Sequence, residues 1–196
     1  MHRTIFDTPL VNTGLRALSR GFLRATGWRI EGSLPPGAAK SVLIAAPHTS
    51  NWDLPYTLMV AFDLRLHIYW MGKASIFRWP FGGLMRSWGG IPIQRHLSLN
   101  MVEQAIQGFR DNREFILVLS PEGTRKKVER WKMGFYHIAL GAGVPIVPGA
   151  LDFANRRVVI GAPFQPTGDA EADLQALLAF FRPYVPKKPE YAFYGD

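Results

Sequence analysis

Short runs of aliphatic residues alternate with helix-forming segments along most of this chain, and this alternation restricts the fold more than any other feature. Residues 41–46 and 114–119 are mostly aliphatic or aromatic, as is typical of strands that are buried on both faces of a sheet. Residues 97–112 instead place apolar side chains at helical spacing. Because the two patterns alternate, we predict an α/β fold with a single mixed sheet flanked by helices.

The other expected elements follow from the same two patterns. We predict further strands over residues 65–71, 91–95, 144–151 and 157–160. We predict further helices over residues 52–62, 76–88, 131–140 and 170–181, the first of them capped by Ser50 or Asn51. A length of 196 residues suits a single domain, in which a connection over residues 31–37 joins an N-terminal arm (1–30) to a core (41–165).

The N-terminal arm has the pattern of an amphipathic helix. Four apolar residues follow the spacing of one helical face: Val11, Leu15, Leu18 and Phe22. Three arginines recur every four residues on the opposite face: Arg16, Arg20 and Arg24. Such a helix can lie in the interface of an anionic membrane, or it can pack its apolar stripe on the domain core. Both arrangements stay open at this point.

The charge balance indicates a negatively charged partner. The chain has 23 Lys and Arg against 15 Asp and Glu, a formal net charge of +8. Nucleic acid, an anionic membrane surface and a phosphorylated substrate would each fit this balance. The sequence has no helix-turn-helix pattern, zinc ligands or RNP-type aromatic block, so nucleic acid is not expected.

Several other classes of protein are excluded or not expected. The chain contains no cysteine, which excludes disulfide scaffolds, thiolate metal sites and cysteine nucleophiles. Its first ten residues lack the apolar region of a secretory signal, and no apolar run is long enough for a transmembrane helix. We therefore expect a cytoplasmic protein that is peripheral on the cytoplasmic face of the membrane.

The first motif with chemical potential places His48 just after a buried strand and Asp53 five residues later. Histidine is the side chain whose pKa lies nearest neutrality, so it can accept a proton from a hydroxyl group. An aspartate on the other ring nitrogen fixes the tautomer and stabilises the imidazolium. The more common reading of this spacing alone is a structural hydrogen bond.

The second motif, Ser120-Pro121-Glu122-Gly123-Thr124-Arg125, follows the strand expected over residues 114–119. Glycine allows close approach to the backbone, threonine offers a hydroxyl, and arginine offers a bidentate contact to phosphate. Taken alone, the motif also fits a glycine turn followed by a solvated basic segment.

Two further motifs are unremarkable when each is considered alone. Residues 89–95 (GGIPIQR) form a turn and a short strand that ends in Arg95. Residues 144–148 (VPIVP) form an apolar strand with a proline near each end.

Together, in this order and spacing, the four motifs resemble the glycerolipid acyltransferase family. That family, which includes the bacterial 1-acyl-glycerol-3-phosphate acyltransferases, is marked by H-x4-D, G-x-x-x-I-x-R, P-E-G-T-R and V-P-I-V-P-like blocks. All four blocks occur between His48 and Pro148, about half of the chain. The resemblance implies a glycerol-3-phosphate acyltransferase-like fold with its catalytic core within residues 41–165.

The resemblance also implies a role for each matching residue. His48 would deprotonate the acceptor hydroxyl, which then attacks an acyl thioester, and Asp53 would orient and stabilise His48. The phosphate of the acceptor would be held by Arg95, Gly123, Thr124 and Arg125. Glu122 would order the acceptor site, and Lys73, which matches a lysine often found in relatives, would add a phosphate or carrier contact. Residues 144–148 would shape the side that holds the acyl chain.

The expected reaction is therefore transfer of a fatty acyl group from acyl-CoA or acyl-carrier protein to a lysophospholipid, converting 1-acyl-glycerol-3-phosphate to phosphatidate. No cofactor, metal or covalent acyl-enzyme is expected. One alternative is an acceptor without phosphate, such as a lyso-ornithine lipid, and another is a non-catalytic basic module that binds membranes. A hydrolase is disfavoured because neither an activated nucleophile nor a metal-ligand cluster is evident.

Aromatic residues are concentrated over residues 52–88. Most of them are expected in the core. Trp79 and Phe81 have a second interpretation, since aromatic side chains also favour the membrane interface or the lining of an acyl tunnel.

Overall fold

The computed structural model describes residues 4–93 and 98–195, and over these residues seven strands form one mixed sheet. The strands are β1 (Arg29–Glu31), β2 (Lys40–Ala45), β3 (Ile68–Lys73), β4 (Gly90–Ile93), β5 (Phe115–Leu119), β6 (Ile146–Asp152) and β7 (Arg157–Ile160). Their order is β1-β7-β6-β2-β5-β3-β4, and only the β6–β7 pair is antiparallel. The predicted single mixed sheet is confirmed.

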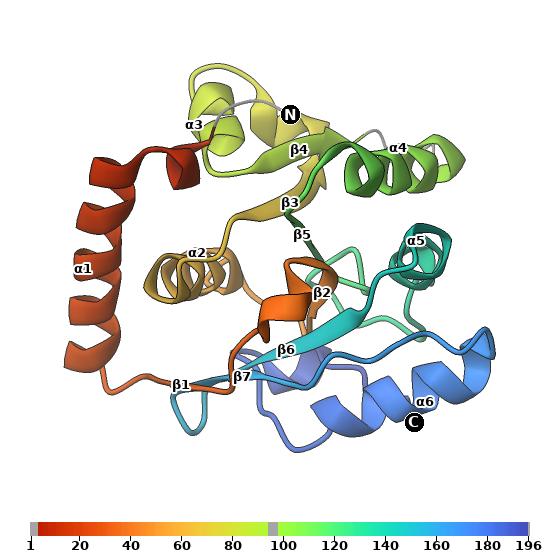
Figure 1. The fold of residues 1–196 in the computed structure, drawn as a ribbon. Coiled ribbons are helices and arrows are strands. Elements are labelled where there is room, and N and C mark those ends of the chain that lie inside the picture. Colours follow the sequence, from red (N-terminus) through yellow and green to blue (C-terminus); the bar gives the residue numbers. More distant parts are fainter. Residues whose placement is uncertain (1–3, 94–97, 196) are drawn as a thin grey trace.

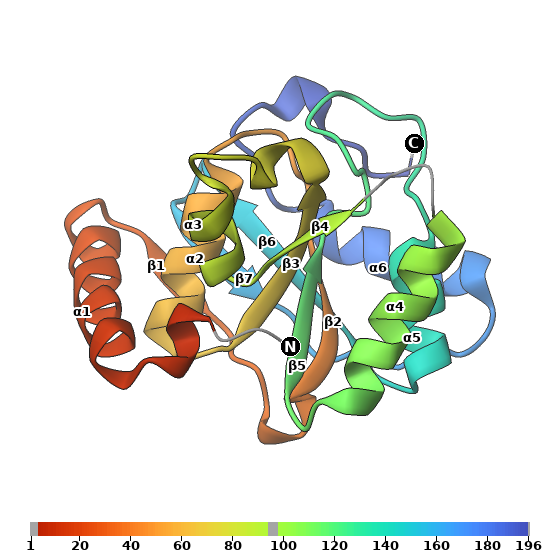
Figure 2. The same cartoon turned by 90° about the horizontal axis from the view of Figure 1, so that it is seen from above.

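Helices cover both faces of this sheet. They are α1 (Pro9–Ala25), α2 (Asp53–Leu64), α3 (Gly82–Ser87), α4 (Ser98–Asp111), α5 (Gly134–Ala142) and α6 (Ala170–Phe181). Helices α1, α2 and α3 lie on one side of the sheet, and α4, α5 and α6 lie on the other (Figures 1 and 2). Short 3-10 helices occur at Ile5–Asp7, Pro36–Ala38, Ala74–Phe77 and Pro189–Tyr191.

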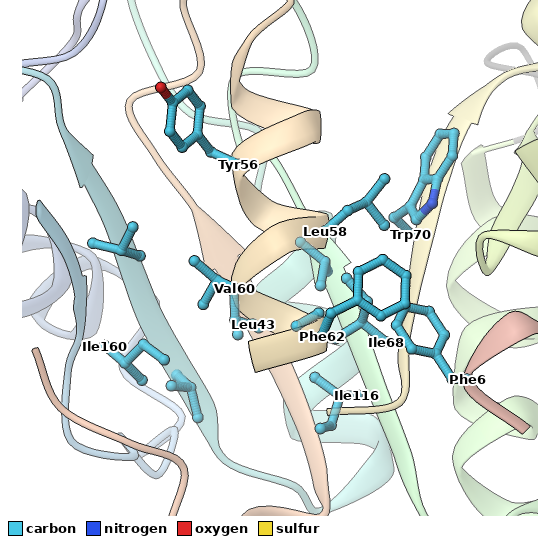
Figure 3. Packing of buried hydrophobic residues seen from close by; sticks show 14 of the residues in the cluster. Phe6, Leu43, Tyr56, Leu58, Val60, Phe62, Ile68, Trp70, Ile116 and Ile160 are labelled. Carbon is cyan, nitrogen blue, oxygen red and sulfur yellow. The ribbon is translucent and has the colours of Figure 1, made fainter. Parts of the chain in front are cut away.

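The central strand β2 divides its side chains between two cores because successive residues of a strand point to opposite faces. Leu43 belongs to the core beneath α2, whereas Val42 and Ile44 belong to the core beneath α5 and α6. Figure 3 shows the first of these cores, where Val60 and Phe62 of α2 lie over the sheet. A strand buried on both sides needs the continuous aliphatic run seen in the sequence.

Several predicted boundaries are wrong, each for a local reason. The strand expected from residue 65 begins at Ile68, because α2 extends to Leu64 and Arg65 ends it in a left-handed conformation (φ 56°). The helix expected over residues 76–88 divides into two short elements around Pro80, whose ring cannot continue a helix.

Two other expectations are corrected. The helix expected over residues 131–140 begins only at Gly134. The cap residue of α2 is Trp52, with no side-chain capping bond, whereas Ser50 uses its hydroxyl to accept a hydrogen bond from the Trp52 N–H at 3.1 Å. Strand β1 was not expected, since a three-residue element with charges at both ends carries no hydrophobic pattern.

Helix α1 turns two of its arginines toward the protein. Arg20 Nε donates to Oδ1 of Asp63 in α2 at 2.7 Å, and Arg16 Nε donates to the carbonyl oxygen of Asp63 at 3.0 Å. On the apolar stripe, Leu15 packs against the core, but Leu18 is 71% exposed. Packing of the whole stripe on the core is therefore contradicted, and Arg16 and Arg20 face α2.

No helix in the described ranges is both long enough and apolar enough to cross a bilayer.

Candidate active site

Two loops meet where β2 and β5 end, at the same edge of the sheet. These strands are parallel neighbours, and Ile44 near the end of β2 pairs with Leu119 at the end of β5. His48 lies on the loop after β2 and Glu122 on the loop after β5. The sheet therefore brings together two motifs that are more than seventy residues apart in the sequence, at the kind of strand edge where α/β proteins bind ligands.

The His48 imidazole is paired with Asp53. Nδ1 of His48 lies 2.8 Å from Oδ2 of Asp53, and the histidine side chain is 28% exposed. The structure assigns no hydrogen-bond partner to Nε2 within the described part of the chain. With Nδ1 as the donor, Nε2 has its lone pair available, so it can accept a proton from a ligand hydroxyl.

The backbone of the same loop fixes the Asp53 carboxylate. Its Oδ2 also accepts hydrogen bonds from the amides of Thr49 at 3.0 Å and Ser50 at 2.9 Å. Its Oδ1 is buried and has no partner among the residues that the structure describes. Three donors on one oxygen leave the carboxylate little freedom, so the orientation of His48 is fixed as well.

Glu122 joins the two loops. Its Oε1 accepts a hydrogen bond from the His48 backbone N–H at 3.1 Å, and its Oε2 accepts one from the Ser120 hydroxyl at 2.8 Å. The side chain is only 3% exposed, and this burial raises the pKa of Glu122 although the hydrogen bonds oppose the shift. Both carboxylate oxygens thus have protein partners, and a role toward an acceptor stays a prediction.

Three of the predicted phosphate-binding residues, Gly123, Thr124 and Arg125, directly follow Glu122 on its loop. Gly123 is left-handed (φ 61°), and a Cβ there would come within 3.3 Å of Nζ of Lys132. Thr124 is partly exposed, and Arg125 is exposed. Lys73 ends β3 and is exposed, whereas Arg95 lies outside the described residues.

Exposed cations continue along the segment after Glu122. They are Arg125, Lys126, Lys127, Arg130 and Lys132. This segment makes the rim of the site basic, which favours a ligand with an anionic group. Among the residues that the structure describes, no group of three or more His, Asp or Glu side chains is placed to hold a metal ion.

An apolar groove of about 230 Å³ lies along α2. It is lined by Leu15, Leu54, Pro55, Leu58, Phe62 and Trp88. Leu54, which is in this lining, directly follows Asp53 in the sequence. The sequence analysis did not identify this groove, although the i, i+4, i+8 spacing of Leu54, Leu58 and Phe62 marks its wall on α2.

Residues 144–148 contribute to the sheet. Ile146 and Val147 are fully buried, and β6 pairs with β2 along Val42 to Ala45. The predicted contact of this motif with an acyl chain stays a prediction. In the structure this motif lies in β6, beside β2, the strand that precedes the His48 loop.

The aromatic residues of 52–88 divide between core and surface. Phe77 is buried, whereas Trp79 is 93% exposed and Phe81 is 65% exposed. Trp52, next to Asp53, is also exposed, and its ring lies 6.5 Å from that of Tyr56. Exposed aromatic side chains therefore occur both beside the site and on the adjoining α3 region.

The C-terminal segment reaches the site, which the sequence analysis did not predict. The Lys188 N–H donates to the Thr49 hydroxyl at 3.1 Å, one residue from His48. The contact joins residues 139 positions apart. No local sequence pattern marks such a contact.

Comparisons with known proteins agree with this architecture. The crystal structure of PlsC from Thermotoga maritima, a 1-acyl-sn-glycerophosphate (LPA) acyltransferase, superposes with a TM-score of 0.60. The likeness covers 88% of this chain and 79% of that one at 14% sequence identity, so it shows a shared fold. A search of curated proteins finds no match. The family model named Acyltransferase matches residues 28–152, which include the His48 and Glu122 loops, and the chain therefore belongs to the acyltransferase family.

Proposed function

We propose that this acyltransferase moves a fatty acyl group from acyl-CoA or acyl-carrier protein to the free hydroxyl of a lysophospholipid, with 1-acyl-glycerol-3-phosphate as the acceptor. The observation that carries the proposal is the His48–Asp53 pair, whose Nδ1–Oδ2 distance is 2.8 Å and whose Nε2 has no hydrogen-bond partner among the described residues. Exposed cations follow Glu122 on the neighbouring loop, and an apolar groove runs along α2 from Leu54, the residue after Asp53. These two features suit an acceptor with both a phosphate and an acyl chain.

In the proposed reaction, Nε2 of His48 takes the proton of the acceptor hydroxyl as the oxygen attacks the thioester carbonyl. Asp53 stabilises the imidazolium that forms. The tetrahedral intermediate then expels the thiolate, which takes the proton from His48 and leaves as the thiol. The products are the new ester and free CoA or carrier-protein thiol, with no cofactor and no acyl-enzyme.

The developing oxyanion needs a hydrogen-bond donor. The amides of Thr49 and Ser50 are already bound to Asp53, and the Trp52 amide is bound to Ser50. The structure gives the amide of Asn51 no acceptor among the described residues. Asn51 is therefore our candidate for the oxyanion donor.

The acceptor phosphate is assigned to the basic rim. Arg125 offers a bidentate contact, and Gly123 and Thr124 offer the backbone and a hydroxyl beside it. Lys73 ends the strand next to β5 and adds a second exposed cation at the same edge. The family resemblance adds Arg95 to this group.

A lipid acceptor requires the protein to reach a membrane, and we propose that the enzyme binds the cytoplasmic face of an anionic membrane peripherally. Exposed apolar side chains on two helices support this proposal. They are Leu10, Val11, Leu18 and Phe22 of α1, with Trp79, Phe81 and Leu84 in or near α3. These helices lie on the same side of the sheet (Figures 1 and 2). The apolar face of α1, rather than Arg16 and Arg20, would contact the lipid.

The test uses purified protein, lysophosphatidate and either acyl-CoA or acyl-carrier protein. Thiol release should depend on the acceptor and fall at least 100-fold in His48→Ala and Asp53→Asn. The matched controls are His137→Ala and Asp111→Asn, whose side chains are exposed on α5 and α4. Undiminished turnover by His48→Ala would remove the proposed base.

The same assay separates the alternatives. A lyso-ornithine acceptor that is used better than lysophosphatidate would reassign the acceptor to a lipid without phosphate. Vesicle binding without any thiol release, from either donor, would indicate a non-catalytic membrane module.

A further inference from the structure

The polypeptide after α6 returns to the edge of the sheet that holds the site. The Phe153 N–H, just after β6, donates to the carbonyl oxygen of Val185 at 2.8 Å. Lys188 then contacts Thr49, and the Tyr194 hydroxyl donates to the carbonyl oxygen of Tyr184 at 2.7 Å. We call residues 184–195 the C-terminal segment. It lies outside the stretch that matches the family model, residues 28–152.

Thr49 links this segment to the catalytic pair. Its hydroxyl accepts the Lys188 N–H at 3.1 Å, and its own N–H donates to Oδ2 of Asp53 at 3.0 Å. The Thr49 side chain is buried, so water does not readily replace either partner. A shift of the C-terminal segment would therefore move the backbone that holds Asp53 and, through it, His48.

We infer that the C-terminal segment is part of the active site and that Thr49 is the positioning residue through which it holds the His48 loop. The inference rests on the proposed function for its kinetic readout. Displacing a catalytic group by about 1 Å can lower a rate 100-fold, so a loop held at its backbone matters for turnover. Arg125 lies on the other loop, so a change at Thr49 should leave substrate binding at the basic rim unaffected.

The kinetic test compares three threonine variants. Thr49→Val removes the acceptor, and we expect kcat to fall about tenfold while KM for both substrates changes less than about twofold. Thr49→Ser keeps a hydroxyl and should recover most of kcat. Thr26→Val is the control, since the Thr26 hydroxyl bonds only within α1. A Thr49→Val enzyme with normal kcat, or a Thr49→Ser enzyme as slow as Thr49→Val, would overturn the inference.

Hydrogen–deuterium exchange tests the same contact without any turnover. The loop over residues 46–52 should exchange faster in Thr49→Val than in the wild type, Thr49→Ser or Thr26→Val. If the wild type transfers no acyl group, the proposed function fails, but the exchange result still decides whether Lys188 and Thr49 hold this loop. Equal exchange in all four proteins would refute the contact.

Discussion

The backbone N–H of His48 donates to Oε1 of Glu122 at 3.1 Å, and this bond joins the loops that follow two neighbouring strands. The carboxylate also accepts the Ser120 hydroxyl on its other oxygen. Glu122 therefore holds together the loop that contains His48 and the loop that continues into the basic segment.

Removing the Glu122 carboxylate should lower both the stability of the fold and kcat. We expect Glu122→Ala to lower the free energy of unfolding by about 1–3 kcal/mol, because the His48 N–H and the Ser120 hydroxyl lose their acceptor. The kcat for thiol release should fall at least tenfold. Urea denaturation and steady-state kinetics measure the two effects, with Glu114→Ala, an exposed residue before β5, as the control. A wild-type kcat in Glu122→Ala would show that the hydrogen bonds of Glu122 do not position the His48 loop for the reaction.

The same carboxyl group should make stability depend on pH. Burial raises the pKa of Glu122 above its ordinary value of 4.5, so the folded protein keeps this proton at pH values where the unfolded chain has lost it. Its stabilising contribution is complete below about pH 4.5 and declines as the pH rises through the folded pKa.

Glu122→Gln, which cannot ionise, provides the comparison for this pH effect. The stability of the wild type relative to Glu122→Gln should fall as the pH rises above about 4.5 in urea denaturation. A relative stability that rises with pH there would mean that the folded protein favours the carboxylate.

The contact between α1 and α2 should contribute modestly to stability. Arg20 is 42% exposed, so solvent weakens its ion pair with Asp63. We expect Asp63→Ala to lower the free energy of unfolding by about 1 kcal/mol or less, and Asp111→Ala, on the exposed end of α4, to change it little. A loss of several kcal/mol would show that α1 depends on this pair far more than its exposure suggests.

The outward face of α1 should govern binding to lipid. Leu18→Glu should weaken binding to vesicles that contain anionic lipid, because a charge replaces an apolar group at the interface. Thermal stability should stay unchanged, since Leu18 is already exposed. Leu140→Glu, at an exposed position of α5 on the other side of the sheet, is the matched control (Figure 1). Equal loss of binding in both variants would indicate a general charge effect.

A buried polar cluster away from the site should serve stability alone. The Tyr136 hydroxyl donates to Oδ2 of Asp173 at 2.8 Å, and the Thr167 N–H donates to the same oxygen at 2.7 Å. Tyr136→Phe should lower the free energy of unfolding by about 1–2 kcal/mol and leave kcat within twofold of the wild type. A large kcat effect would connect this cluster to the site.

The sequence predicted the parts of the fold that depend on local pattern. The aliphatic runs of β2 and β5 must be buried on both faces, so their place in the sheet follows from composition. The spacing of His48 and Asp53 likewise produces a contact within one loop and helix turn. Glu122 was identified by its motif, but its bond to the His48 backbone depends on which strands are neighbours.

What could not be predicted arises from tertiary packing. A helical wheel identifies the two faces of α1, but it cannot tell that Asp63 on another helix attracts the arginine face. The edge strand β1 has too few residues for a pattern and forms because β7 offers a partner. The contact of Lys188 with Thr49 has no local signal, since it involves a backbone N–H that every residue except proline carries.

The bonds among His48, Glu122 and Lys188 also bear on how the protein folds. Because the loop after β2 is held by a residue 74 positions later and by contact with a segment 139 positions beyond Thr49, the site requires long-range closures of the chain. Such closures are entropically costly and tend to form slowly. Recovery of enzymatic activity during refolding should therefore lag behind recovery of helical circular dichroism.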